Sequence, residues 1–294
     1  MTWTKNLDLR SPRELTAKLA ETVANLNLSR TIRLFAGLWV ALVIIVAVLA
    51  PILPLEDPLT ISLTHQFQGP TINHLLGTDN VGRDTLSRLI WGSRPALVGV
   101  FLAILAATII SIPWGVASAL GGALFDNLLM RLADGVLAFP QLILAITVAG
   151  LLGPSLDHTM LAIGIAFSPG LARIVRANIL QTRDRDYSMI SRQLGRSQLG
   201  ATISHIIPNS IGPFIVQINI LAGVALLAET GLNFLGLGVN PPAPSWGEMI
   251  STGYQYLSPH PELALIPGIC VFLTVLSIFE LGDALQDIVI RKSN

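Results

Sequence analysis

The chain has 294 residues, of which 52% are hydrophobic and 12% charged, with a formal net charge of zero. Soluble domains carry about 25% charged residues, so this composition indicates a protein embedded in a lipid bilayer, and we expect no nucleic-acid partner. The single cysteine, Cys270, excludes a disulfide framework and a cysteine-based zinc site.

The first 33 residues are polar and contain no apolar core of a cleavable signal peptide. Ser11-Pro12-Arg13-Glu14 has the pattern of a capping box with proline at the first helical position. The apolar residues that follow recur on one face of a helix: Leu15, Leu19, Val23 and Leu26. The segment 1–33 is therefore predicted to hold an amphipathic helix, roughly 12–27, on the membrane surface or a neighbouring subunit.

Apolar, uncharged runs predict six transmembrane helices, because a helix needs about 20 apolar residues to cross about 30 Å of hydrocarbon. The runs lie at 34–55, within 95–125, and at 135–156, 159–172 with Ile174 and Val175 added, 206–228 and 263–279. The second run is too long for one helix, and the Gly121-Gly122 pair suggests where it ends; the fourth is short. The expected fold is an all-α integral membrane protein with a first span at 34–55, a loop at 56–94, a five-span core at 95–285 and a tail at 286–294.

Positive charge predicts the orientation of these spans. All but three of the 18 lysines and arginines fall before the first span, between the second and third, after the fourth, or in the tail. The exceptions are Arg83, Arg88 and Arg94. Since positive charge gathers on the cytoplasmic side, both termini are expected in the cytoplasm, with 56–94 and 236–262 outside.

The polar segment 184–208 is patterned although it separates two apolar runs. Its residues from 185 read RDYSMISRQLGRSQLGATISHIIP. Two apolar stripes of helical spacing flank a break at Gly195, where a left-handed helix cap would place a glycine: Tyr187, Ile190 and Leu194, then Leu199 and Ile203. Two short helices at an angle are therefore predicted, with Pro208 at the entry to the fifth span. The stripes could lie on the membrane interface or insert into a cytoplasmic partner.

This segment resembles the cytoplasmic EAA loop of ABC importer permeases in the separation of Gly195 and Pro208 and in the preceding Asp186-Tyr187. It departs from that loop at the triplet Met189-Ile190-Ser191 and at His205. Four further stretches are similar to C-type permeases of dipeptide, oligopeptide and nickel importers: HLLGTDNVGRDTLSRLIWGSR (74–94), DNLLMRLADGVLAFPQLILAI (126–146), AETGLNFLGLGVNPPAPSWGEMI (228–250) and FELGDALQDI (279–288).

The resemblance implies the type I ABC importer permease fold in a bacterial inner membrane. It implies a heterodimer with a second permease, two ATP-binding subunits that hold ATP and Mg, and an extracytoplasmic substrate-binding protein. It also implies peptide cargo, with nickel or a metal chelate as the alternative within the family. The residues it assigns to ATPase coupling are Asp186, Tyr187, Ile190, Leu194, Gly195, Leu199, Ile203, His205 and Pro208.

The sequence itself offers no catalytic machinery. It has no G-x-x-x-x-G-K-[ST] phosphate-binding loop, so ATP must be held by a partner. Its five histidines form no H-x-x-x-H or H-E-x-x-H pair. We therefore expect a non-catalytic subunit with no cofactor, metal or catalytic residue of its own.

Several polar and aromatic residues of the spans and the outer loop have more than one possible role. Glu229 lies near the outer end of the fifth span, where a carboxylate is costly and is usually functional or paired; it either packs between helices or lines the path. Trp246 and Tyr254 lie in the proline-rich loop 236–262, as docking residues or interfacial anchors. Local pairs are expected for Asp84 with Arg88 and for Arg131 with Asp134.

The rival function class is an ion-coupled secondary transporter. Such a protein couples transport through intramembrane acids and broken helices. Glu229 is its one candidate acid, and the patterned segment 184–208 would then have no role.

Overall fold

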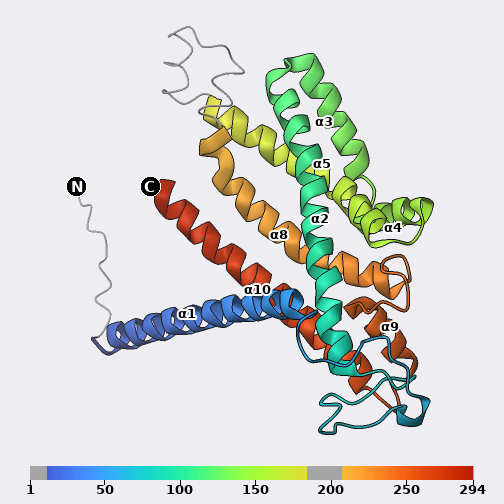
Figure 1. Ribbon diagram of the computed structural model, residues 1–294. Helices are drawn as coiled ribbons and strands as arrows, with labels where there is room; N and C mark the ends of the chain where they lie inside the picture. Colours follow the sequence, from blue (N-terminus) through green and yellow to red (C-terminus); the bar gives the residue numbers. More distant parts are fainter. Residues whose placement is uncertain (1–11, 184–206, 294) are drawn as a thin grey trace.

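The computed structural model describes residues 12–183 and 207–293. Within these ranges the chain is helical, and its only β-type pairing is an isolated bridge between Thr78 and Asp84. The helices are α1 (Pro12–Leu49), α2 (Thr85–Leu120), α3 (Ala123–Leu137), α4 (Gln141–Leu152), α5 (Leu156–Arg183), α8 (Ile207–Phe234), α9 (Trp246–Gln255) and α10 (Glu262–Ser293), with a short 3-10 turn at Leu63–His65 (Figure 1). The predicted all-α fold is confirmed, as expected where lipid leaves the backbone to satisfy its own hydrogen bonds.

Five of these helices are long and apolar enough to cross a membrane: α1, α2, α5, α8 and α10. The pair α3 and α4 makes a sixth crossing if it is counted as one broken span, because the two helices meet at 86°. The third span expected at 135–156 is therefore a bent pair of helices and not a single helix. Pro140 lacks a backbone N–H, and its ring disfavours helical geometry at Phe139, so α3 ends at Leu137 and α4 begins after the proline.

Other helix boundaries also differ from the sequence-based ones. The expected surface helix at 12–27 is continuous with the first span, and α1 ends at Leu49, before Pro51 and Pro54. α2 begins at Thr85, inside the predicted loop, because the Asp84 carboxylate caps it by accepting from the backbone N–H of Ser87 at 2.7 Å. The fourth span is a full-length helix, α5, rather than a short one.

Small residues bring α2 and α5 into close contact along their length. A Cβ added to Gly164 would lie 2.5 Å from the Cβ of Ala106, and one added to Gly115 would lie 2.6 Å from the carbonyl oxygen of Ala172. Ala103 and Ala107 on α2 are fully buried at the same contact. Such packing is the usual basis of helix association in membranes, where burial of apolar surface supplies no driving force between helices.

The loops gather at two ends of the helix bundle. One end, which we call the cap, consists of residues 50–84 and 235–261 and lies at the bottom of Figure 1 beside the start of α2. At the opposite end, α5 stops at Arg183 and α8 starts at Ile207, near the junction of α2 and α3 (Figure 1). The predicted segments 56–94 and 236–262 thus share one end, and Arg183 and Ile207, which flank residues 184–206, lie at the other.

Candidate functional site: the cap, a buried glutamate and a polar groove

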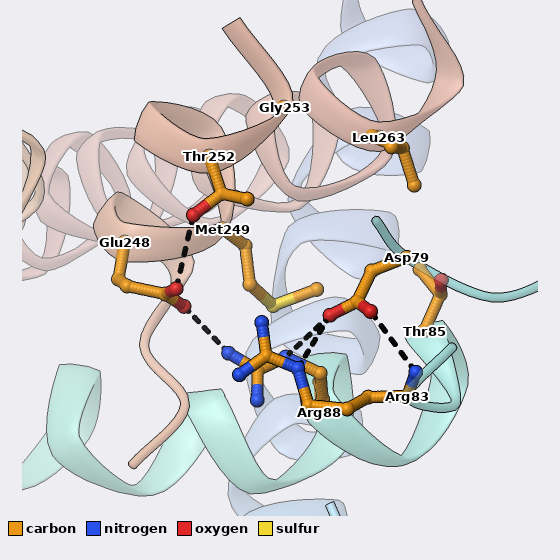
Figure 2. Close-up of a pocket in the computed structure, with 9 residues that line it drawn as sticks. All are labelled: Asp79, Arg83, Thr85, Arg88, Glu248, Met249, Thr252, Gly253 and Leu263. Atoms are coloured by element: carbon orange, nitrogen blue, oxygen red, sulfur yellow. Dashed lines mark hydrogen bonds and ion pairs between the residues drawn. The ribbon is translucent and has the colours of Figure 1, made fainter. Parts of the chain in front are cut away.

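Arg88, in the first turn of α2, is the centre of a charged cluster that holds the cap together (Figure 2). Its Nη2 donates to Oε2 of Glu248 on α9 at 2.6 Å, and its Nε lies 3.7 Å from Oδ2 of Asp79. Its Nη1 donates to the carbonyl of Pro58 at 3.1 Å. Because Arg88 is only 2% exposed, these contacts join α2, α9 and the segment after α1 in a buried site.

The local pair expected between Asp84 and Arg88 is wrong. Asp84 caps α2 and lies 3.1 Å from Nδ1 of His74. Arg88 instead bonds to Glu248, which also accepts from the hydroxyl of Thr252 at 3.1 Å. Tertiary partners therefore outcompete the i, i+4 neighbour.

Trp246 and Tyr254, expected as docking residues or interfacial anchors, differ in exposure. Trp246 is 3% exposed, and its Nε1 donates to the carbonyl of Leu89 at 2.9 Å. It packs against Gly92, where an added Cβ would come within 3.1 Å of the indole. This burial corrects the docking role predicted for Trp246, which instead anchors α9 on α2. Tyr254 is 62% exposed and keeps a free surface, with its ring edge-on to Phe234.

Glu229 is enclosed by its own chain. It is 1% exposed and lies against Gly99 of α2, where an added Cβ would be 3.3 Å from its Cγ. The carboxylate accepts hydrogen bonds from the side chains of Asn233 and, at 3.4 Å, Thr230. Asn233 in turn accepts from the backbone N–H of Val239 in the cap at 2.6 Å. The geometry therefore favours the packing role over a place on the path.

At the opposite end of the bundle, arginines of α5 bind acidic residues of α3. Arg176 makes two parallel hydrogen bonds to Asp126, each at 2.5 Å, and Ser118 of α2 donates to the same carboxylate. Arg173 pairs with Asp134, so the local Arg131–Asp134 pair expected from the sequence is wrong. These bonds connect α2, α3 and α5 beside the point where α5 ends.

The residues predicted for ATPase coupling lie mostly outside the described part of the chain. Pro208 is the second residue of α8, at the entry to the predicted fifth span. The others fall in 184–206: Asp186, Tyr187, Ile190, Leu194, Gly195, Leu199, Ile203 and His205.

One polar feature was missed by the sequence analysis. A groove of about 160 Å³ lies between α4, α5 and α8, lined by Gln141, Phe167, Gly170, Leu171, Gln217, Ile220, Leu221 and Val224. The signal that could have found it is the uncharged amide of Gln217 inside an apolar span, since polar side chains in membrane helices tend to face protein or water. Among the described residues, no group of three His, Cys, Asp or Glu is placed to hold a metal ion.

The long apolar helices of the described residues identify a multi-pass membrane protein, with a charged cap at one end of its helix bundle. Comparison with known proteins gives the family. Residues 111–294 match the family described as binding-protein-dependent transport system inner membrane component, and the chain belongs to it.

Individual relatives extend the likeness beyond the matched region. The chain is 36% identical to the dipeptide transport system permease protein of Alkalihalophilus pseudofirmus, over 83% of this chain and 80% of that protein. It is 32% identical to the glutathione transport system permease protein of Pectobacterium atrosepticum, over 86% of this chain and 84% of that protein. The inward-facing MetNI methionine ABC transporter shares the fold, with a TM-score of 0.57, 16% identity, and coverage of 69% of this chain and 96% of that one.

Proposed function

We propose that this chain is one of two permease subunits of an ATP-driven importer and forms half of a membrane path for peptides. The observation that carries the proposal is the likeness to a dipeptide permease over more than four-fifths of the chain, together with the family match. The fold supports it, since the helices of an importer permease provide the same arrangement.

The proposed cargo is peptide rather than nickel or a metal chelate. The similar proteins are described as transporting dipeptides and glutathione. An ion-coupled secondary transporter is disfavoured, because its one candidate acid, Glu229, is enclosed between α8 and α2 and bonded to Asn233.

Energy would enter through the segment 184–208. The chain has no phosphate-binding loop of its own, so two partner ATPases would hold ATP and Mg and contact this segment. α5 and α8 lead directly into and out of it. Because Arg176 and Arg173 fix α5 to α3, a displacement of the segment would move these helices as a unit.

The cap would face the outside of the inner membrane and receive the substrate-binding protein, with both termini in the cytoplasm. The distribution of lysine and arginine supports this orientation. Tyr254 supplies an exposed aromatic surface for docking, and the buried cluster around Arg88 would keep that surface in one shape.

Co-purification tests the subunit composition. The tagged chain, extracted from its native host in mild detergent, should bring down a second permease and one or two kinds of ATPase. Recovery of the chain alone, or as a homodimer without an ATPase, would contradict the proposal and return the secondary transporter to first place.

A further inference from the structure

We infer that the groove between α4, α5 and α8 binds the backbone of a peptide in transit, through the side-chain amides of Gln141 and Gln217. This inference rests on the proposed function, which supplies the peptide. It adds the place on this chain that the cargo touches and the chemical group that is recognised.

The two amides need a polar partner that the chain itself does not supply. Within the described residues, neither the Gln141 nor the Gln217 side chain is hydrogen-bonded to another protein group. Two other side-chain amides of the spans do have partners: Asn219 donates to the carbonyl of Ile278 at 2.6 Å, and Asn233 donates to Glu229. An amide that faced hydrocarbon without a partner would be strongly disfavoured.

The groove lies at membrane depth and not at the edge of the bilayer. Gly170 is near the middle of α5, which runs from Leu156 to Arg183. Gln217 lies inside the apolar stretch Gly212–Phe234 of α8. Polar groups at this depth normally face a water-filled cavity or another polar surface, and a translocation path provides both in turn.

Its lining matches a peptide bond better than a charged group. A glutamine amide carries one acceptor oxygen and two N–H donors, so it can bond to both the N–H and the C=O of a backbone. No charged side chain lines the groove, and the rest of the lining is apolar apart from Gly170. Recognition of this kind ignores the cargo's side chains and its net charge, which suits a path that passes peptides of varied sequence.

The groove has room for more than a single water. Its volume of about 160 Å³ exceeds the roughly 10–15 Å³ that a single water requires. Gly170 borders open space, because a Cβ added there would meet no atom within 4 Å. The helix tolerates the neighbouring Pro169, which removes the hydrogen bond to the Ile165 carbonyl, because the Ser168 hydroxyl donates to that carbonyl at 2.9 Å.

The test uses the whole transporter, co-expressed with its partner subunits, and measures ATP-driven uptake of a labelled dipeptide. Gly170→Leu should fill the groove and lower uptake at least tenfold while the subunits still co-purify. Gln217→Met, which keeps the length but removes the amide, should lower uptake about two- to tenfold, the range of one lost hydrogen bond. The matched control is Gly268→Leu on α10, where an added Cβ also meets no atom within 4 Å but no groove residue lies; its uptake should stay within twofold.

A second readout identifies the occupant. In a Cys270→Ser background, Gln217→Cys should react with a small water-soluble thiol reagent, and dipeptide should slow that reaction. Absence of reaction would mean that lipid covers the groove. Loss of co-purification in Gly170→Leu would mean that the second permease fills it. Either result, or wild-type uptake by both groove variants, would overturn the inference while leaving the proposed function intact. No dipeptide uptake by the wild-type complex would instead overturn the proposed function, and the peptide site with it.

Discussion

Arg88 and Glu248 are 160 positions apart in the chain, and their side chains meet at 2.6 Å in the interior of the cap. Glu248 belongs to a helix that interrupts the outer loop, and Arg88 belongs to the first turn of a membrane span. This one contact therefore attaches the loop end of the molecule to the transmembrane bundle.

Removing one charge of this pair should destabilise the protein strongly. A buried ion pair that loses one partner leaves the other charge uncompensated, which costs about 3–5 kcal/mol. We expect Arg88→Met to show a loss of this size in thermal unfolding of the detergent-purified protein. The double variant Arg88→Met/Glu248→Met should lose less than the sum of the two single changes.

Arg94 gives the matched control for that experiment. It is exposed and lies 5.3 Å from the centre of the Trp91 ring, an arrangement worth about 0.5–1 kcal/mol at exposed sites. Arg94→Met should therefore change the stability by less than about 1 kcal/mol. Equal losses for Arg88→Met and Arg94→Met would show that the cap does not depend on the buried pair.

Replacement of Glu229 by glutamine should be mild. Glutamine has nearly the same shape, and its oxygen can still accept the bond from Asn233. Loss of a whole hydrogen bond would correspond to about two- to twelvefold, so with the bond kept we expect dipeptide uptake within about threefold of wild type. Glu229→Ala should lower the free energy of unfolding by about 1–3 kcal/mol, because Asn233 and Thr230 lose an acceptor. Abolished uptake in a stable Glu229→Gln variant would place this residue on the path.

Close packing of α2 on α5 predicts that one glycine cannot be enlarged. Gly164→Ala would place a Cβ 2.5 Å from the Cβ of Ala106, and overpacking of this kind costs about 1–3 kcal/mol. Gly231→Ala on α8 is the comparison, since its Cβ would meet no atom within 4 Å. The melting temperature should fall for Gly164→Ala and hold for Gly231→Ala. A fall of the same size in both would remove the packing argument.

Two ion pairs between α3 and α5 should differ in strength. The Asp126 and Arg176 side chains are 20% and 29% exposed and share two bonds, whereas those of Asp134 and Arg173 are 63% and 43% exposed. Hydrogen bonds to charged groups contribute about 1.5–3 kcal/mol when shielded, and exposed pairs about 0–1 kcal/mol. Asp126→Asn should therefore destabilise the protein in chemical unfolding more than Asp134→Asn, and the reverse order would contradict this assignment.

The sequence was sufficient to predict the class of fold and the approximate place of each span, because the length and charge of apolar runs can be read directly from the order of residues along the chain. It did not reveal the 86° angle between α3 and α4 at Pro140, since an uncharged run does not show in which direction the chain continues after a helix ends. Pro140 signals a helix break in the sequence, but the apolar run around it is long enough for one span and therefore predicted a single helix.

The roles predicted for Trp246 and Arg88 were wrong because contacts between helices, and not neighbours along the chain, determine the partners of these side chains. Trp246 is a residue type common at membrane interfaces, yet Gly92 on α2 leaves the space in which its ring is buried. Arg88 has an acidic neighbour one helical turn away but bonds to Glu248 on another helix. Spacing along the chain shows which residues share a face, not which face meets another element.

The most direct measurement of the central claim is uptake by purified complex in proteoliposomes. The complex is supplied with ATP on the side of its ATPase subunits and with its substrate-binding protein on the opposite side. It should then transport a labelled dipeptide against a gradient toward the ATPase side. Uptake should stop without ATP and should not require an ion gradient. Dipeptide accumulation driven by an ion gradient in the absence of ATP, or no accumulation under any condition, would contradict the account.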